Sequence, residues 1–300
     1  MKTRPFVSII IPTLHREKAL CDTLMYLFDQ DYPKYEIIVV DQSVRHREET
    51  LKFLNDHKTK IKYFQISKKG TTIAKNYGLK CAKGEIILFV DDDIKPAQNL
   101  ISEHVVNYEN QNIGGVSGRI EVQDNSMIKD EEGKVGFVTK DGRFIDNYSS
   151  KTSCEVMTVH GCNASFRKDF LDKVHGFDEN FTGNAIREES DLSFRIRRLG
   201  YKLVFDPHAE VLHLKASGGS RDKDRITWYE DFFRNEMLFF MKHLPHRYLV
   251  LRILNKIRPI LSCMFYYGKG NPRAIIAPWR GFINGYKLYK KEIKDRSEWL

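Results

Sequence analysis

One stretch of the chain sets an unbroken apolar run directly against three carboxylates. The residues Ile86–Val90 are all apolar, and Asp91, Asp92 and Asp93 follow them. A short apolar run with β-branched and aromatic members is typical of a strand buried on both faces, as in the interior of a parallel sheet. The carboxylates then fall at its carboxyl end, the edge where open α/β sheets bind ligands. Because adjacent negative charges repel, this cluster indicates either a divalent cation with oxygen ligands or a charged turn after a strand.

Strand and helix patterns alternate along the first ninety residues. Strands are predicted at 6–11, 36–40, 61–66 and 86–90, and helices at 18–30, 48–57 and 71–84. This order predicts right-handed crossovers and a mainly parallel sheet whose polar strand ends share one edge. Thr13, Asp41 and Asp91 each stand at the end of a strand, so we expect them to line one cleft.

Residues 121–155 break this rhythm because they are polar and rich in turn formers. We predict a β-hairpin insertion there, with Asp141 and Gly142 in the turn between 137–138 and 144–145. Further strands are predicted at 201–205 and 210–214, with His213 in the second. A lone histidine on a strand is more often packed in the core than a ligand.

A late helix carries three acids in its first turn, namely Glu188, Glu189 and Asp191. Acids at a helix N-terminus interact favourably with the helix macrodipole. Taken alone, these residues therefore favour a role in stabilising the helix over a functional site. The small residues Gly161 and Cys162 suit either close approach to a ligand or tight packing.

The charge of the chain is concentrated near its C-terminus. Residues 242–300 hold 13 Lys and Arg against 3 Asp and Glu, whereas residues 1–241 hold 36 against 37. The main domain is therefore not predicted to bind nucleic acid, and the basic, aromatic tail either contacts an anionic membrane or packs on the domain. The five cysteines are odd in number and form no C-x-x-C pair, which indicates a reducing cytoplasm. We expect neither a signal peptide nor a membrane-spanning segment.

Taken together, these pieces resemble the family 2 glycosyltransferases, inverting enzymes with a GT-A fold, over roughly residues 6–221. The stretches that carry the resemblance are, in chain order, Val7–Thr13, Val39–Asp41, Gly70–Asn76, Phe89–Asp93, Gly161–Arg167, Gly176–Asp178 and Glu188–Leu192. Each is weak alone, but their order and spacing are specific. The chain departs from the family pattern at three positions: Gln42 follows Asp41 where many members have Asp, Lys75 replaces Arg, and Glu189 replaces Asp.

The resemblance implies a role for each matching residue. Asp91 and Asp93, with His213, would hold Mn²⁺ or Mg²⁺, and the catalytic base would be Glu189 or one of its neighbours Glu188 and Asp191. The residues implied in binding the donor, a nucleotide sugar with UDP favoured, are Pro12, Thr13, Asp41, Gly70, Lys75, Asn76, Asp91, Asp92 and Arg221. Those implied in the sugar and acceptor pocket are Gly161, Cys162 and Asn163.

The predicted fold class is α/β of the GT-A type, with a Rossmann-like, mainly parallel sheet flanked by helices. Residues 1–221 would form the catalytic domain, and 222–300 a basic, aromatic, helical C-terminal region. The predicted function is inverting, metal-dependent transfer of a sugar to a glycan or lipid-linked glycan in cell-surface polysaccharide synthesis, at the inner face of the cell membrane. The alternatives are a sugar-nucleotide nucleotidyltransferase, which would need a glycine-rich loop that residues 12–20 lack, and a non-catalytic membrane or nucleic-acid-binding protein.

Overall fold

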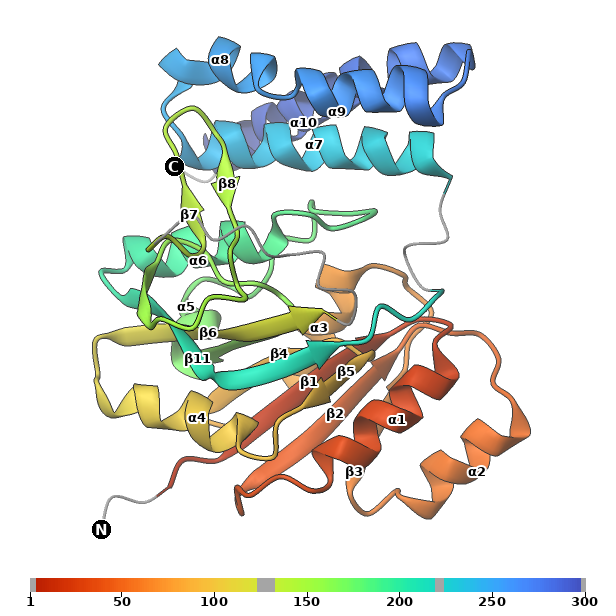
Figure 1. Cartoon of the computed structure of the whole chain (residues 1–300), viewed down its shortest axis with the longest axis vertical. Coiled ribbons are helices and arrows are strands. Elements are labelled where there is room, and N and C mark those ends of the chain that lie inside the picture. The colour runs from red at the N-terminus through yellow and green to blue at the C-terminus, as the bar shows by residue number, and fades with distance from the viewer. Residues whose placement is uncertain (1–3, 123–132, 219–223, 298–300) are drawn as a thin grey trace.

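The structure is a computed structural model that describes residues 4–122, 133–218 and 224–297. Its first half alternates strands and helices as predicted. These elements are β1 (Val7–Thr13), α1 (Glu17–Leu27), β2 (Tyr35–Asp41), α2 (Glu48–Asp56), β3 (Ile61–Gln65), α3 (Thr71–Cys81) and β4 (Ile86–Val90). Every residue of β4 is buried, and β1 pairs in parallel with both β2 and β4. The apolar runs are therefore interior strands of a parallel sheet (Figure 1).

The second half of the chain completes a mixed sheet. It adds β5 (Ile94–Pro96), α4 (Leu100–Val106), β6 (Ile113–Val122), β9 (Cys154–Val156), β10 (Asn163–Arg167), α5 (Lys168–Lys173), α6 (Glu188–Arg198) and β11 (Lys202–His213). The strand order is β3-β2-β1-β4-β10-β6-β11-β5, and β9 pairs with β11. Strand β10 runs antiparallel to both of its neighbours, whereas β6 and β11 are parallel. The sheet is mainly parallel, as predicted, with β10 reversed at its centre and with β5 and β9 antiparallel to β11.

One prediction for this half is wrong, because β11 is a single strand and not two. Its pairing with β6 slips between Asp206 and Glu210 and then resumes. The break that Asp206 and Pro207 indicated in the sequence is therefore a local irregularity, which strands tolerate when a neighbour keeps both ends in register.

A hairpin rises from the sheet towards the C-terminal helices. Strands β7 (Phe137–Val138) and β8 (Phe144–Ile145) pair antiparallel around Asp141 and Gly142, as predicted. Arg252 Nη2 donates a 2.9 Å hydrogen bond to the carbonyl of Lys140, and Asn255 Nδ2 donates one of 2.9 Å to that of Asp141. The hairpin turn is thereby joined to the C-terminal helices. Residues 123–132 of the predicted insertion lie outside the described residues.

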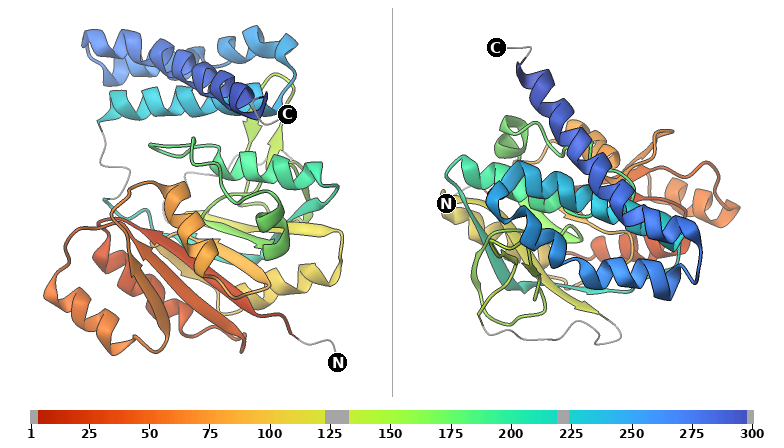
Figure 2. Two further views of the ribbon diagram at one scale, coloured as in Figure 1. Left: turned by 180° about the vertical axis from the view of Figure 1, so that it is seen from behind. Right: turned by 90° about the horizontal axis from the view of Figure 1, so that it is seen from above.

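The C-terminal region stacks two layers of helix on the α6 side of the sheet (Figures 1 and 2). Its elements are α7 (Arg225–His243), α8 (Leu249–Leu254), α9 (Ile257–Leu261), the π-helical segment η4 (Ser262–Tyr267) and α10 (Pro272–Ser297). Helix α7 lies over α6, and α8, α9, η4 and α10, which we call the outer layer, cover α7. Across the three described ranges, no helix is long and apolar enough to cross a membrane.

Helix α10 lies unusually close to α7 because two glycines face the seam. A Cβ atom added at Gly281 would overlap the carbonyl oxygen of Glu230, and one added at Gly285 would overlap that of Arg234. Beside them, the rings of Phe233 and Phe282 are 4.9 Å apart. Only glycine allows two helix backbones to approach this closely, so the outer layer is fixed on α7 by these positions.

Candidate active site

The carboxyl ends of β1, β2 and β4 meet at one edge of the sheet. Thr13 ends β1 beside the half-buried Pro12 and is in register with Asp41 at the end of β2. Thr13 Oγ1 donates a 2.6 Å hydrogen bond to Asp92 Oδ2, which follows β4. The polar groups that end these three strands therefore share one edge, which forms the floor of the candidate site.

The three consecutive aspartates have different surroundings. The side chain of Asp91 is 35% exposed and its Oδ2 lies 3.5 Å from His213 Nε2. The side chain of Asp93 is fully buried, with Oδ1 3.6 Å from the same nitrogen. Asp92 instead accepts a 2.9 Å hydrogen bond from Arg16 Nη1. Asp91 and Asp93 thus form one cluster with His213 at the end of β11, and Asp92 supports the turn between them.

This cluster fits a divalent cation. Asp91, His213 and Cys162 each offer one ligand atom, and these atoms lie within 4.8 Å of one another. Asp93 Oδ1 is buried and accepts no hydrogen bond from the residues that the structure describes. A buried carboxylate oxygen without a hydrogen-bond donor is costly, and a cation beside it would remove that cost. Carboxylate oxygens are hard ligands that suit Mg²⁺ and Mn²⁺.

The electrostatics of the cluster favour its carboxylates over its thiol as ligands. Burial would raise the pKa of Asp91, but the hydrogen bond and charge of His213, with the charge of Lys75, lower it to about 2. Burial raises the pKa of Asp92 to about 6. Burial and the charge of Asp91 also raise the pKa of the Cys162 thiol. At neutral pH Asp91 is therefore ionised, whereas Cys162 is a neutral and weaker ligand.

The first acid of α6 forms a buried ion pair with α3. Lys75 Nζ lies 2.6 Å from Glu188 Oε1, and both side chains are almost fully buried. The same ammonium lies 5.8 Å from the ring centroid of Phe89 and 5.1 Å from that of Phe177. Burial raises the pKa of Glu188, and the charge of Lys75 opposes that shift. The carboxylate of Glu188 is thus held against α3.

The second acid of α6 is the more accessible one. Glu189 is partly exposed, whereas Glu188 is buried. No described residue donates a hydrogen bond to the Glu189 carboxylate, although its backbone carbonyl accepts one of 2.6 Å from Ser193. A Cβ atom added at Gly161 would lie 3.7 Å from the carboxyl carbon of Glu189. Its carboxylate therefore stands beside the loop that leads into β10.

The third acid of α6 joins that helix to α7. Asp191 is fully buried, with Arg195 Nε 2.7 Å from Oδ2 and both His243 Nε2 (2.7 Å) and Lys242 Nζ (3.1 Å) near Oδ1. Burial would raise its pKa, but His243, Arg195 and Lys242 together hold it below its usual range. Both oxygens of Asp191 are thus committed to partners within the protein.

The loop residues Gly161 and Cys162 connect the two groups of acids. Gly161 lies against Glu189, and Cys162 belongs to the cluster of Asp91 and His213. Because the two loop residues are adjacent in the chain, the strand-end acids and the helix acids lie near the same loop, and we call the region around it the crevice.

Asp41 and Gly70 lie at the β2 side of this edge. Asp41 Oδ2 accepts a 3.1 Å hydrogen bond from the Tyr63 hydroxyl and lies 3.4 Å from His46 Nε2. The backbone N–H of Gly70, which precedes α3, donates a 2.5 Å hydrogen bond to Gln42 Oε1. Gln42, at a position where the chain departs from the family pattern, thus connects the end of β2 to the start of α3.

Two residues implied by the resemblance have side chains that brace the framework. Asn76 Nδ2 donates to the carbonyl of Phe177 (2.9 Å), and its Oδ1 accepts from the N–H of the same residue (2.8 Å). Asn163 Nδ2 donates to a carbonyl of β11 (2.8 Å), and its Oδ1 lies 2.8 Å from His104 Nε2. Neither side chain is directed at the crevice by these contacts. Arg221 lies outside the described residues.

Arg16 is a site residue that the sequence reasoning missed. Its Nη1 lies 2.9 Å from Asp92 Oδ1 and 3.2 Å from Asp93 Oδ2, and its Nε donates a 3.3 Å hydrogen bond to the carbonyl of Gly218. Arg16 thus joins the acidic turn to the loop after β11. Its position three residues beyond β1, near a predicted cluster of carboxylates, was the available signal.

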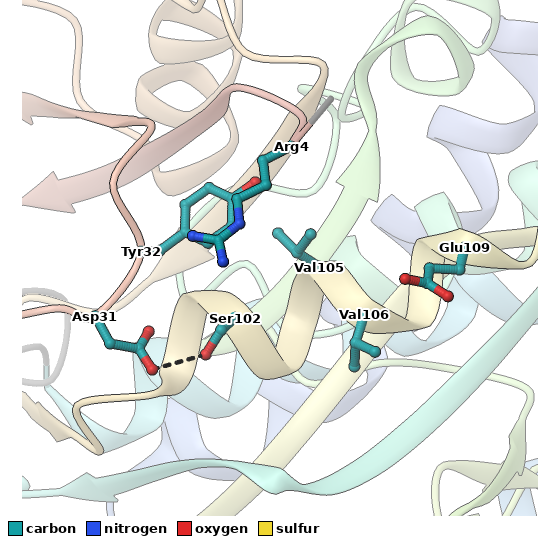
Figure 3. Close-up of a pocket in the computed structure, with 7 residues that line it drawn as sticks. All are labelled: Arg4, Asp31, Tyr32, Ser102, Val105, Val106 and Glu109. Atoms are coloured by element: carbon teal, nitrogen blue, oxygen red, sulfur yellow. Dashed lines mark hydrogen bonds between the residues drawn. The ribbon is translucent and has the colours of Figure 1, made fainter. Parts of the chain in front are cut away.

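A separate surface pocket of about 250 Å³ lies away from these acids (Figure 3). It is lined by Arg4 before β1, by Asp31 and Tyr32 after α1, and by residues of α4 and the turn after it. Ser102 Oγ donates a 3.1 Å hydrogen bond to Asp31 Oδ2 at its rim. Because Arg4 precedes β1 while Thr13 ends it, this pocket belongs to the opposite edge of the sheet from the crevice.

Comparison with known proteins identifies the family. The model of glycosyl transferase family 2 matches residues 8–175, more than half of the chain. A probable glycosyltransferase of Bacillus subtilis, YdaM, is 26% identical over 225 residues, which cover 70% of this chain and 50% of that protein. The GalNAc(5)-diNAcBac-PP-undecaprenol β-1,3-glucosyltransferase of Campylobacter jejuni is 28% identical over 203 residues, 65% of each chain. The chain thus spans between half and two thirds of the length of these relatives.

A solved structure shares the fold along most of the chain. It is the mannosyltransferase PcManGT of Pyrobaculum calidifontis, in complex with GDP-Man and Mn²⁺, with a TM-score of 0.57 and 20% sequence identity. The match covers 93% of this chain and 74% of that one. With the family model and the sheet topology, this likeness agrees with the fold that the motifs predicted. The chain therefore belongs to glycosyl transferase family 2 and has the GT-A fold.

Proposed function

We propose that this enzyme moves a sugar from a nucleotide diphosphate sugar to a hydroxyl group of a glycan or lipid-linked glycan, with inversion at the anomeric carbon. The observation that carries the proposal is the cluster of Asp91, His213 and Cys162, with Glu189 beside the adjacent loop residue Gly161. A sugar held between a cation-binding cluster and an accessible carboxylate is arranged for single displacement.

Asp91, Asp93 and His213 would hold the divalent cation, Mn²⁺ or Mg²⁺. Asp93 Oδ1, which accepts no hydrogen bond from a described residue, and the ionised Asp91 are the two oxygen ligands that support this assignment. A cation bound there would offset the negative charge that develops on the departing nucleotide diphosphate. Arg16 forms ion pairs with Asp92 and Asp93 and so stabilises the turn that carries the proposed metal ligands Asp91 and Asp93.

Among the three acids of α6, Glu189 is our candidate for the catalytic base. Glu188 is paired with Lys75, and Asp191 is held by partners on α6 and α7. The Glu189 carboxylate would accept the proton of the acceptor hydroxyl as its oxygen attacks the anomeric carbon from the face opposite the leaving group. The side chain of Glu189 is one methylene longer than that of the aspartate usual in the family. The position of α6 would therefore determine how close the carboxylate comes to the acceptor hydroxyl.

The donor would lie along the carboxyl ends of β1, β2 and β4. Pro12, Thr13, Asp41 and Gly70 border that edge, and UDP-sugars are the donors we would test first. Asn76 would contribute by bracing the loop at Phe177. The role of Arg221 in donor binding remains a proposal from the resemblance alone.

The acceptor would be lipid-linked or near a membrane, and the enzyme would act at the cytoplasmic face of the cell membrane in cell-surface glycan synthesis. The name of the relative from Campylobacter jejuni describes a lipid diphosphate acceptor. Residues 242–300 hold 13 basic and only 3 acidic residues, and this positive charge is compatible with an anionic membrane surface.

A panel of nucleotide sugars would test the proposal. We expect UDP-sugars to raise the melting temperature when Mn²⁺ or Mg²⁺ is present and not when EDTA is added. Asp93→Ala should abolish both this stabilisation and sugar transfer, whereas Asp56→Ala, which changes an exposed acid at the end of α2, should leave both unchanged. Full donor-dependent transfer by Asp93→Ala would place the chemistry elsewhere.

A further inference from the structure

The first part of the outer layer exposes a row of apolar side chains. They recur every three or four residues, which places them on one face of a helical segment. Their exposed fractions are 70% for Val250, 51% for Leu254, 47% for Ile257, 45% for Leu261 and 69% for Phe265. Residues this apolar are seldom exposed in a continuous row on a surface that contacts only water.

Helix α10 exposes a second apolar row with the same helical spacing. Ile276, Trp279, Ile283 and Tyr286 are between 41% and 55% exposed. The opposite face of α10 is packed on α7 through its glycines, so this row points away from α7. In the view from above, α10 and the α8–η4 segment both lie over α7 (Figure 2). Both rows therefore lie in the outer layer, the layer farthest from the sheet.

Basic side chains accompany these rows. Arg258, Lys269, Lys287 and Lys291 are exposed in the same layer, and only 3 acidic residues occur between 242 and 300. Two copies of this surface would repel each other, so self-association through it is disfavoured. An anionic bilayer offers both of the required features, negative headgroups for the basic side chains and an acyl boundary for the apolar rows.

We propose that the outer layer is a membrane-docking face that lies flat in the interface of an anionic bilayer. Aromatic side chains such as Trp279 and Phe265 would lie at headgroup depth, with the basic side chains around them. Because α7 separates this face from α6, the membrane lies on the α6 side of the sheet, and a lipid-linked acceptor approaches Glu189 from that side. The proposal deepens the proposed use of a membrane-bound acceptor and, for this last point, rests on it.

Sedimentation with lipid vesicles tests the docking face directly. We expect the full chain to pellet with vesicles of phosphatidylcholine and phosphatidylglycerol, less with phosphatidylcholine alone, and less at high salt. Arg258→Gln/Lys287→Gln/Lys291→Gln should weaken binding to the anionic vesicles on the order of 100-fold, at roughly fivefold per charge. Val250→Ser/Phe265→Ser/Ile283→Ser should reduce binding to both kinds of vesicle at least tenfold.

Matched changes outside the outer layer provide the controls. Lys52→Gln/Lys58→Gln/Lys80→Gln removes three exposed charges from α2, from the turn between α2 and β3, and from α3. Met25→Ser/Leu51→Ser/Val106→Ser removes three apolar side chains that are 51% to 52% exposed. Both control variants should bind vesicles as the unchanged chain does. If the outer-layer variants also bind unchanged, or if the apolar variant abolishes a dimer seen by analytical ultracentrifugation, the docking face is refuted.

Donor-induced stabilisation, measured in the same samples, separates this proposal from the catalytic one. Loss of vesicle binding with stabilisation by UDP-sugar and Mn²⁺ intact supports a docking face distinct from the crevice. Absence of vesicle binding by the unchanged chain, with donor stabilisation present, contradicts the docking face alone. Vesicle binding without any donor stabilisation contradicts the glycosyltransfer proposal alone and leaves the docking face supported.

Discussion

At the scale of single residues, the site depends on how neighbouring acids are divided among partners. Lys75 pairs with Glu188, and His243 with Asp191, while Glu189 stays accessible. The sequence could indicate that acids gather at the start of a helix, but not this division. The reason is physical: the partners come from α3 and α7, and only packing determines which acid each of them meets.

Replacing these acids one at a time should separate catalysis from stability. Glu189→Gln is expected to lower kcat by roughly 10² to 10⁴-fold with donor affinity and melting temperature unchanged, because it would remove only the proposed general base. Glu188→Gln should instead destabilise the protein by about 3 kcal/mol, since Lys75 would remain buried without its counter-charge. Steady-state kinetics and thermal unfolding of both variants check this. Wild-type turnover by Glu189→Gln would exclude it as the base.

A buried histidine should make stability depend on pH. Burial lowers the pKa of His104 to about 4, although its bond with Asn163 opposes the shift. Since its folded pKa lies below the unfolded value, the stability it contributes is complete above the unfolded pKa and is lost as pH falls towards 4. Between pH 7 and pH 5 this loss should be about 2 kcal/mol.

Urea unfolding of the unchanged chain and of His104→Gln at both pH values measures this contribution. The unchanged chain should lose about 2 kcal/mol more than the variant over this interval, because glutamine does not titrate. Equal losses for the two proteins would mean that His104 is not held neutral in the folded state.

At the scale of elements, α6 is held in place by α7 and by the β7–β8 hairpin. Glu236 of α7 is fully buried between two cations, Arg187 Nη2 at 2.7 Å and Lys256 Nζ at 2.7 Å. Arg187 directly precedes α6 in a left-handed conformation, with φ of 76°, and its guanidinium lies 3.3 Å from the ring centroid of Phe144. The start of the helix that carries Glu189 is thus anchored to the C-terminal region.

We expect Glu236→Gln to destabilise the protein by about 3 kcal/mol, because two cations would lose their shared counter-charge. It should also lower kcat at temperatures well below the melting point, since Arg187 would no longer fix the start of α6. Glu230→Gln, on the same helix, removes only a longer pair with Arg280 (3.8 Å) and should change stability by less than about 0.5 kcal/mol. Normal turnover by Glu236→Gln in its folded state would show that the pair has no positioning role.

The elements that could be predicted from the sequence are those whose apolar side chains recur at the regular spacing of a strand or a helix. The apolar runs of β1, β2 and β4, the amphipathic helices between them and the turn at Asp141 and Gly142 were all predicted from local pattern. Strand β10 was not predicted, because its residues Asn163, Ala164 and Ser165 are small or polar. They form a strand because they pair with β4 and β6. Arg16 was missed for a similar reason: its partners Asp92 and Asp93 are distant in sequence.

At the scale of the whole molecule, the outer layer depends on the close contact between α10 and α7. Gly285→Leu should drive the two helices apart, lower stability by about 1 to 3 kcal/mol and increase amide hydrogen exchange in both helices. Lys290→Leu, at an exposed position of α10, should do neither. Hydrogen exchange followed by mass spectrometry measures both variants. Unchanged protection of α10 in Gly285→Leu would mean that the seam does not hold the layer.

The ion pair between Glu236 and Lys256 has a practical consequence for anyone who shortens this protein. A version that stops after α7 would retain every candidate catalytic acid, yet the carboxylate in the middle of α7 would lose one of its two counter-ions. Removing the outer layer to obtain a shorter protein would therefore also weaken the anchor at the start of α6, the helix that carries Glu189. Low turnover of such a fragment would not show that the substrate tested was the wrong one.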